Sequence, residues 1–213
     1  MFGIIFTGFL LILILWILFS QSRADEKFSK GVNMAAFLIE NPDKFIDQAR
    51  ISEILNHIRK EKWNCFLFGD PYFALKKIVS PAGVKYFLSV PKNCEKYFKD
   101  SPGLSKTDYS IIPEQKFYSA ASLKYIPSKI NYDNPKMHEN EGAALQALIR
   151  YSDKTPFESN IKMLTWADSK ERAEKILWLK PKKSAVFDFF HKIFDNKNRV
   201  AVSIKELKDI FLQ

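Results

Sequence analysis

Side chains that could bind a metal or carry out acid–base chemistry are few in this sequence. The three histidines, His57, His138 and His191, lie in three different predicted helices. The segment MHENE at 137–141 places one of them beside two glutamates, near an expected helix start. Its spacing differs from the H-E-x-x-H pattern of zinc hydrolases, and the helix macrodipole favours acidic residues in a first turn. We therefore expect no metal site there.

Motifs that bind nucleotides are missing as well. The sequence has no G-x-x-x-x-G-K-[ST] loop and no G-x-G-x-x-G fingerprint, and none of its seven glycines is placed to cradle a phosphate. No Ser, Cys or Thr belongs to a recognisable nucleophile motif. We predict no catalytic residue, no cofactor and no metal ligand, and expect a protein that is not an enzyme. A triad assembled from distant residues stays open.

Composition limits the remaining classes. The formal net charge is +9, but most basic residues are Lys and no run of five or more Lys/Arg occurs. Nucleic-acid binding is thus an alternative that we do not favour, and a solvated lysine surface with some attraction to anionic lipid is expected. Cys65 and Cys94 are too few for a disulfide framework and match no zinc spacing; whether they pair is left open.

The first residues are strongly apolar. Residues 1–19, MFGIIFTGFLLILILWILF, carry no charge and would span about 28 Å as a helix, close to the roughly 30 Å core of a bilayer. The nearest cations, Arg23, Lys27 and Lys30, all follow this stretch. We predict a transmembrane anchor over 1–20, single-pass in the inner or cell membrane, with a cytoplasmic body. The alternative is a cleaved signal peptide, which would place the body outside the cytoplasm.

A linker over 21–30 leads to a first domain expected over 31–115. The segment GVNMAAFLIE predicts a strand, and the helix after it has apolar residues spaced to bury one face. YFALKKIVS and GVKYFLSVP predict a hairpin in which Gly83 supplies a positive φ. KNCEKYFKD is a short helix and TDYSII a strand. The order is that of a split βαβ, ferredoxin-like unit, so the predicted fold class is α+β.

A second α/β domain is expected over 116–213. FYSAASLKYIPSKI is extended, and a helix is predicted over Pro135–Tyr151. FESNIKMLTW is a strand, and the helix in ADSKERAEKI begins at a cap provided by Asp168 or Ser169. KSAVFDFFHKIF is an amphipathic helix, RVAVSI a strand, and SIKELKDIFL a terminal helix that begins with a serine cap.

Two features concern repetition and surface. Residues 84–98 and 161–175 both run strand, two-residue break and helix, a pattern that a weak internal repeat or similar packing demands would both produce. In FDFFHKIF at 187–194, the side chains of Phe187, Phe190, Ile193 and Phe194 share one helical face. We expect that face to pack into the core rather than to bind a partner.

Several segments carry a family resemblance. ALKKIVSPAGVKYFLSVPKNCEKYFKD resembles the strand–strand–helix segment near the N-terminus of conjugation-type, FtsK-like transfer ATPases of Gram-positive and ultra-small bacteria. TPFESNIKMLTWADSKERAEKI followed by KSAVFDFF resembles a later segment, and NRVAVSIKELKDIF is similar to the strand and helix before their motor domain. The resemblance implies the membrane-proximal region of a type IV secretion ATPase. Since no Walker loop occurs in this chain, it implies no catalytic residue here.

We therefore expect a non-catalytic, membrane-anchored assembly or docking module of a type IV secretion or DNA-transfer machine. Its expected partners are the membrane and proteins of the transfer complex, among them a motor ATPase, and a second copy of the chain is a further candidate. The alternative function is an exported α/β domain that binds a solute or an envelope component after signal cleavage. A reporter fused after Gln213 would separate the two topologies.

Overall fold

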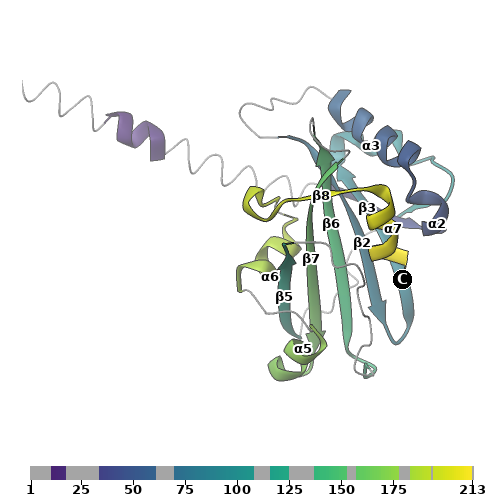
Figure 1. Ribbon diagram of the computed structural model, residues 1–213, viewed down its shortest axis with the longest axis vertical. Helices are drawn as coiled ribbons and strands as arrows, with labels where there is room; N and C mark the ends of the chain where they lie inside the picture. Colours follow the sequence, from purple (N-terminus) through teal and green to yellow (C-terminus); the bar gives the residue numbers. More distant parts are fainter. Residues whose placement is uncertain are drawn as a thin grey trace, which may run out of the picture.

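The described part of the chain is built around one sheet (Figure 1). The computed structural model describes residues 11–17, 34–60, 70–107, 116–124, 137–152, 157–177, 183–192 and 194–212. Within them an eight-stranded antiparallel sheet has the order β4-β1-β3-β2-β6-β7-β5, and β8 pairs with β7. The strands are β1 (Met34–Ile39), β2 (Tyr72–Ser80), β3 (Gly83–Pro91), β4 (Leu104–Lys106), β5 (Phe117–Leu123), β6 (Gly142–Tyr151), β7 (Phe157–Ala167) and β8 (Val200–Val202). The helical segments are α2 (Pro42–Phe45), α3 (Gln48–Lys60), η1 (Lys92–Tyr97), α5 (Lys170–Ile176), α6 (Lys183–Phe190), η2 (Asn196–Asn198) and α7 (Ile204–Leu212).

Strands β2 and β6 lie at the centre and join the two halves of the sheet. They pair antiparallel along β2 from Tyr72 to Val79. On its other side each contacts the strand that follows it in the chain, β3 beside β2 and β7 beside β6. β1 then flanks β3, and β5 flanks β7. Strands from the two ranges predicted as separate domains, 31–115 and 116–213, thus share one sheet.

The sequence repeat falls on equivalent places in this sheet. Residues 84–98 contain η1 and all of β3 except Gly83, and residues 161–175 contain most of β7 and all of α5 except Ile176. Counted outward from the centre, the order is β2, β3, β1 in one half and β6, β7, β5 in the other. The repeat in sequence therefore corresponds to a repeat in strand order.

The helices cover the two faces of the sheet with different cores. Because side chains alternate along a strand, each strand supplies residues to both faces. The larger core, which includes Ile54 of α3 and Phe211 of α7, lies between one face and the helices α2, α3 and α7. The smaller core on the opposite face includes Phe189 of α6 and Trp166 of β7. We call this second face the α6 face.

Local sequence signals fix several element ends. Gly83 has φ of 120°, which side-chain-bearing residues rarely adopt, and it closes the β2–β3 hairpin as predicted. Ser169 Oγ accepts the Arg172 N–H at 3.2 Å and caps α5. At the start of α7, Ser203 Oγ accepts the Glu206 N–H, and the Glu206 carboxylate accepts the Ser203 N–H. These three predicted ends are confirmed.

The predicted fold class is wrong. The described residues form one large antiparallel sheet with few helices, rather than ferredoxin-like split βαβ domains behind a transmembrane helix. The helix predicted over Pro135–Tyr151 is replaced by strand β6, whose residues 143–149 are all buried. A run of residues buried on both faces has no period of two, so it cannot be distinguished from a buried helix by pattern. The strand predicted in TDYSII lies almost entirely outside the described residues.

The predicted transmembrane anchor over 1–20 is also contradicted. Of that range the structure describes residues 11–17, which form a short helix with every side chain exposed, set apart from the sheet (Figure 1). No helix among the described residues is both long and apolar enough to cross a bilayer. This finding overturns the prediction of a single-pass protein of the cell membrane. The linker predicted over 21–30 lies outside the described residues.

A close contact at the start of β6 gives the first prediction. A Cβ on Gly142 would lie 2.1 Å from Cζ2 of Trp166, its pairing partner on β7, and Trp166 is only 3% exposed. Because the indole has little room to move, we expect Gly142→Ala to lower the free energy of unfolding by about 1–3 kcal/mol, measured by urea denaturation. In a Trp166→Ala background the same substitution should cost less than about 0.5 kcal/mol. Equal losses in both backgrounds would contradict the clash.

Candidate functional site

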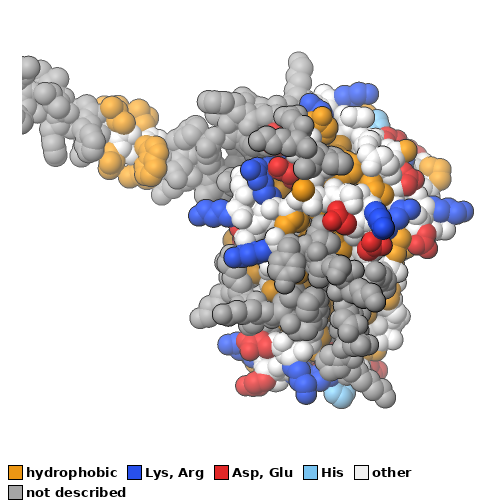
Figure 2. Space-filling model, viewed as in Figure 1, with side chains coloured by type: hydrophobic (Ala, Val, Ile, Leu, Met, Phe, Trp, Pro, Cys, Tyr) orange, Lys and Arg blue, Asp and Glu red, His pale blue; other side chains and the backbone are white. Residues whose placement is uncertain are grey.

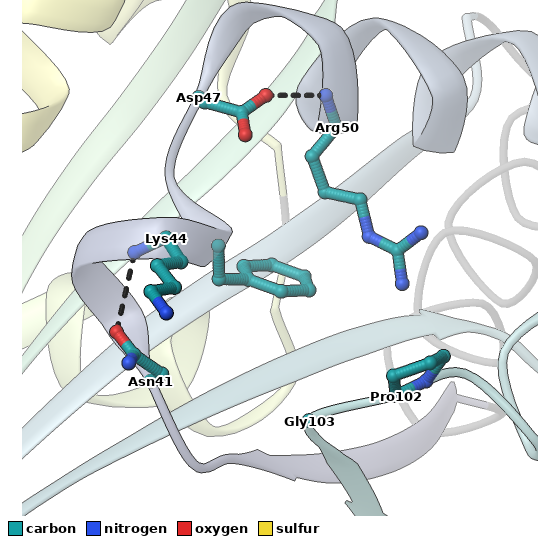
Figure 3. A pocket seen from close by; sticks show the side chains of 7 residues that line it. Asn41, Lys44, Asp47, Arg50, Pro102 and Gly103 are labelled. Carbon is teal, nitrogen blue, oxygen red and sulfur yellow. Dashed lines mark hydrogen bonds between the residues drawn. The ribbon is translucent and has the colours of Figure 1, made fainter.

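An open pocket lies at the corner between α2 and α3 (Figure 3). Its volume is about 350 Å³. Five lining residues come from β1–α2–α3 and two from the turn before β4: Asn41, Lys44, Phe45, Asp47, Arg50, Pro102 and Gly103. The pairing of β4 with β1 brings that turn beside the corner, and the Glu40 N–H donates to the Gly103 carbonyl at 3.1 Å.

Two helix caps give the corner its shape. Asn41 Oδ1 accepts the Lys44 N–H at 3.3 Å at the start of α2, and Asp47 Oδ1 accepts the Arg50 N–H at 2.7 Å at the start of α3 (Figure 3). Pro42 follows Asn41 in the first turn, where its missing N–H is tolerated. One oxygen of each capping side chain is thus used locally, and the side chains of Lys44 and Arg50 reach into the pocket.

The pocket combines two cations with an aromatic floor. Phe45 is 7% exposed, and the Arg50 guanidinium lies 5.5 Å from the centroid of its ring. Arg50 Nη1 also donates to Glu53 Oε2 at 2.7 Å, which uses one of its five N–H groups. Lys44 is exposed. Such a site can bind a carboxylate next to an apolar group, but it offers no nucleophile paired with a base.

The histidines lie on separate elements and none lines this pocket. His57 on α3 stacks on Tyr97, with ring centroids 4.4 Å apart. His138 lies in the turn before β6, and His191 follows α6 with its ring 4.2 Å from that of Phe187. Among the residues described here, no group of three or more His, Cys, Asp or Glu could hold a metal ion.

The acidic segment at 137–141 precedes β6 in the chain and is hydrogen-bonded to α5. The Glu141 carboxylate accepts Arg172 Nε at 2.7 Å, Arg172 Nη2 at 2.8 Å and the His138 N–H at 2.9 Å. The hydrogen bonds from Arg172, with smaller contributions from His138, hold the pKa of Glu141 below its usual value although burial opposes this shift. The segment precedes a strand, so the helix-dipole interpretation given to it was wrong.

A row of polar side chains crosses the centre of the α6 face. Lys76 of β2 pairs with Gln146 of β6, which pairs in turn with Lys162 of β7. Their exposed fractions are 3%, 0% and 0%. Helix α6 covers these three side chains. Lys76 Nζ lies 4.9 Å from the centroid of the Phe189 ring, and Lys162 Nζ donates to the Asp188 carbonyl at 3.4 Å. We call these three residues the Lys76–Gln146–Lys162 row.

Burial changes the protonation of lysines on both faces. Desolvation, and then the charge of Lys192, lower the pKa of Lys76 well below its ordinary value. On the opposite face, desolvation lowers the pKa of Lys77 to about 8, and its ammonium lies 6.0 Å from the Tyr86 ring centroid. The adjacent lysines of one strand therefore both lie in surroundings that disfavour their charged forms.

The turn after α6 is fastened to the same face. Tyr72 Oη donates to the Lys192 carbonyl at 2.7 Å, and Asn160 Nδ2 donates to the Asp195 carbonyl at 2.9 Å. Lys192 has φ of 51°, so the chain leaves α6 through a left-handed residue. Burial raises the pKa of Tyr72, which keeps the phenol protonated as a donor. These bonds hold α6 over the Lys76–Gln146–Lys162 row.

The aromatic face predicted within α6 is divided between core and solvent. Phe189 is fully buried, whereas Phe187 is 51% and Phe190 38% exposed. The expectation that Phe187 and Phe190 pack into the core is therefore wrong, and Phe189 is the anchor that the pattern missed. Phe194 is partly buried, and Ile193 lies outside the described residues.

The remaining sequence features do not converge on either site. Cys94 is buried in η1, and Cys65 is not among the described residues. Figure 2 shows Lys and Arg side chains interspersed with Asp and Glu on the face viewed, and the described part of that face has no continuous basic stripe.

Comparison with known protein families, curated proteins and solved structures finds no match for this chain.

The buried lysines predict how stability depends on pH. The folded pKa of Lys77 is about 8 against an ordinary 10.5, so between these values the unfolded chain binds more protons. The free energy of unfolding should therefore rise from about pH 8 to pH 10. Above this range it should fall, because the folded pKa of Tyr72 is raised and the unfolded phenol ionises first. Urea unfolding between pH 7 and 11 measures this profile.

Substitution of Lys77 tests the assignment. We expect Lys77→Met to raise the free energy of unfolding at pH 7 by about 1 kcal/mol and to reduce the alkaline rise. Lys85→Met is the matched control, since Lys85 is an exposed lysine of the neighbouring strand. It should leave the free energy of unfolding at pH 7 and its rise with pH unchanged. If the free energy of unfolding of Lys77→Met rises with pH as steeply as that of the unsubstituted protein, a group other than Lys77 causes the rise.

Proposed function

We propose that the protein is a non-catalytic docking module for a protein partner of a type IV secretion or DNA-transfer machine, and that it binds an acidic segment of this partner at the α2–α3 pocket. The observation that carries the proposal is the pocket itself, in which Lys44 and Arg50 surround a buried aromatic floor. Asn41 Oδ1 and Asp47 Oδ1 serve as helix caps, so the charged groups left to contact a partner are Lys44, Arg50 and the second oxygen of Asp47, with cations in the majority.

The charge of the chain supports an acidic partner. The formal net charge of +9 favours encounter with negatively charged surfaces and raises association rates with them. A partner carboxylate can accept hydrogen bonds from Lys44 and from the N–H groups of Arg50 that do not contact Glu53. An apolar side chain next to that carboxylate would pack near Phe45, so the preferred segment has acidic residues flanking an aromatic one.

The machine is proposed from the sequence resemblance alone. ALKKIVSPAGVKYFLSVPKNCEKYFKD contains most of β2, all of β3 and η1, and TPFESNIKMLTWADSKERAEKI contains β7 and α5. In the transfer ATPases that these segments resemble, such elements precede the motor domain. The proposed partner is accordingly another protein of the transfer complex, and membrane anchoring is not part of the proposal.

Peptide titration of the full chain tests the docking site. The probes are Ac-EEFEE-NH2 and its uncharged match Ac-QQFQQ-NH2, added to ¹⁵N-labelled protein. We expect the acidic peptide to shift the amide signals of Lys44, Arg50 and Gly103, with weaker binding as salt rises. No shifts, or the same shifts with both peptides, would contradict the site. Equal shifts at these residues with a short DNA duplex would favour nucleic acid instead.

Paired variants sharpen the test. Lys44→Gln and Arg50→Gln together keep both backbone caps and should weaken acidic-peptide binding by about tenfold or more, since each removes a charge-assisted hydrogen bond. Lys170→Gln is the control, because this exposed lysine lies on α5 and contacts Glu174. Undiminished binding in the double variant would place the docking surface elsewhere.

A further inference from the structure

Gln146 is a buried polar side chain whose bonding needs are unmet. It is 0% exposed, and neither Nε2 nor Oε1 has a hydrogen-bond partner in the structure described here. Buried polar groups in native proteins are almost always bonded, and an unsatisfied one calls for a specific cause such as an ion or water that completes the site. Here donor and acceptor of one amide are both unmet, at the centre of the sheet.

Lysine side chains flank this amide on both sides. Gln146 pairs with Lys76 on one side and with Lys162 on the other, and direct partners in a sheet point to the same face about 5 Å apart. Lys192, after α6, lies close enough for its charge to act on Lys76. Two lysines thus flank one unsatisfied amide, with a third near Lys76. A bound anion would favour the protonated form of Lys76, which burial and the charge of Lys192 disfavour.

We propose that the Lys76–Gln146–Lys162 row binds a hydrogen phosphate ion beneath α6. The phosphate oxygens accept hydrogen bonds from the two ammonium groups and from Gln146 Nε2. The P–O–H group donates to Gln146 Oε1, so that both unmet atoms of the amide are satisfied. Sulfate has the same shape but no such proton at neutral pH, and it leaves Oε1 without a donor. A free ion fits better than a large phosphoester because α6 covers the row.

Helix α6 acts as the cover of this site. Phe189 lies over Lys76, and the Asp188 carbonyl accepts from Lys162, so entry of an ion requires α6 to move away from the sheet. The chain after α6 contains the left-handed residue Lys192 and is held by the Tyr72 hydroxyl. A bound phosphate would link the lysines of β2 and β7 and thereby stabilise the closed, folded state.

The first measurement compares phosphate with sulfate on the full chain. Both ions stabilise proteins generally by exclusion from the surface, so sulfate at equal ionic strength is a demanding control. At pH 7 we expect phosphate to raise the melting temperature in a saturable manner by about 3 °C or more beyond sulfate. Equal, non-saturating effects of the two ions would overturn the proposal.

Two variants of Gln146 separate binding from folding. Gln146→Leu removes the amide at similar volume and should abolish the excess effect of phosphate while the protein stays folded. Gln146→Glu supplies a carboxylate between the lysines, so it should raise stability without phosphate and eliminate the phosphate response. Retention of the response in either variant would contradict the site. The pocket variant Lys44→Gln should keep the response in full, so this result is independent of the docking proposal.

Discussion

The pairing of β2 with β6 is the interaction on which the rest of the structure depends. These strands are neighbours along β2 from Tyr72 to Val79, and each is the innermost strand of its half of the sheet. Separated from one another, both would present an unpaired edge of backbone N–H and C=O groups to solvent. Their pairing turns two four-strand groups into a single sheet, which gives α3 and α7 one face to pack on and α6 the other.

The register of that pairing also determines what lies on each face. Phe73 and Leu75 face the larger core, where they support α3 and α7. The intervening positions place Lys76 next to Gln146 on the α6 face. A slip of one residue would exchange these faces, placing Lys76 in the larger core and Phe73 and Leu75 under α6, so the register is strongly specified. The polar row under α6 therefore depends directly on this alignment of β2 with β6.

Sequence reasoning succeeded where the signal was local. Gly83 and the serine caps at Ser169 and Ser203 each depend on a few neighbouring residues, and all three were predicted. It failed for β6, which is buried on both faces and therefore lacks alternation, and for the pairing of β2 with β6, which no local pattern specifies. Both failures made the predicted fold class wrong.

The α2–α3 pocket and the Lys76–Gln146–Lys162 row were also beyond sequence reasoning, because both depend on strand pairing. The pocket was missed because Lys44 and Arg50 meet the Pro102–Gly103 turn only through the pairing of β1 with β4. The lysine row had a visible signal, since two adjacent lysines within a strongly apolar predicted strand must place one on each face. Gln146 had none, because its segment was assigned to a helix.

Amide hydrogen exchange of the full chain tests the single-sheet account most directly. If β2 and β6 bind the two halves into one cooperative unit, the slowest-exchanging amides of β2, β3, β6 and β7 should all exchange only through global unfolding, with the same free energy of opening and the same dependence on denaturant. Exchange of the β6–β7 group through a separate opening at lower denaturant, while β2 and β3 stay protected, would show two independent halves and contradict the account.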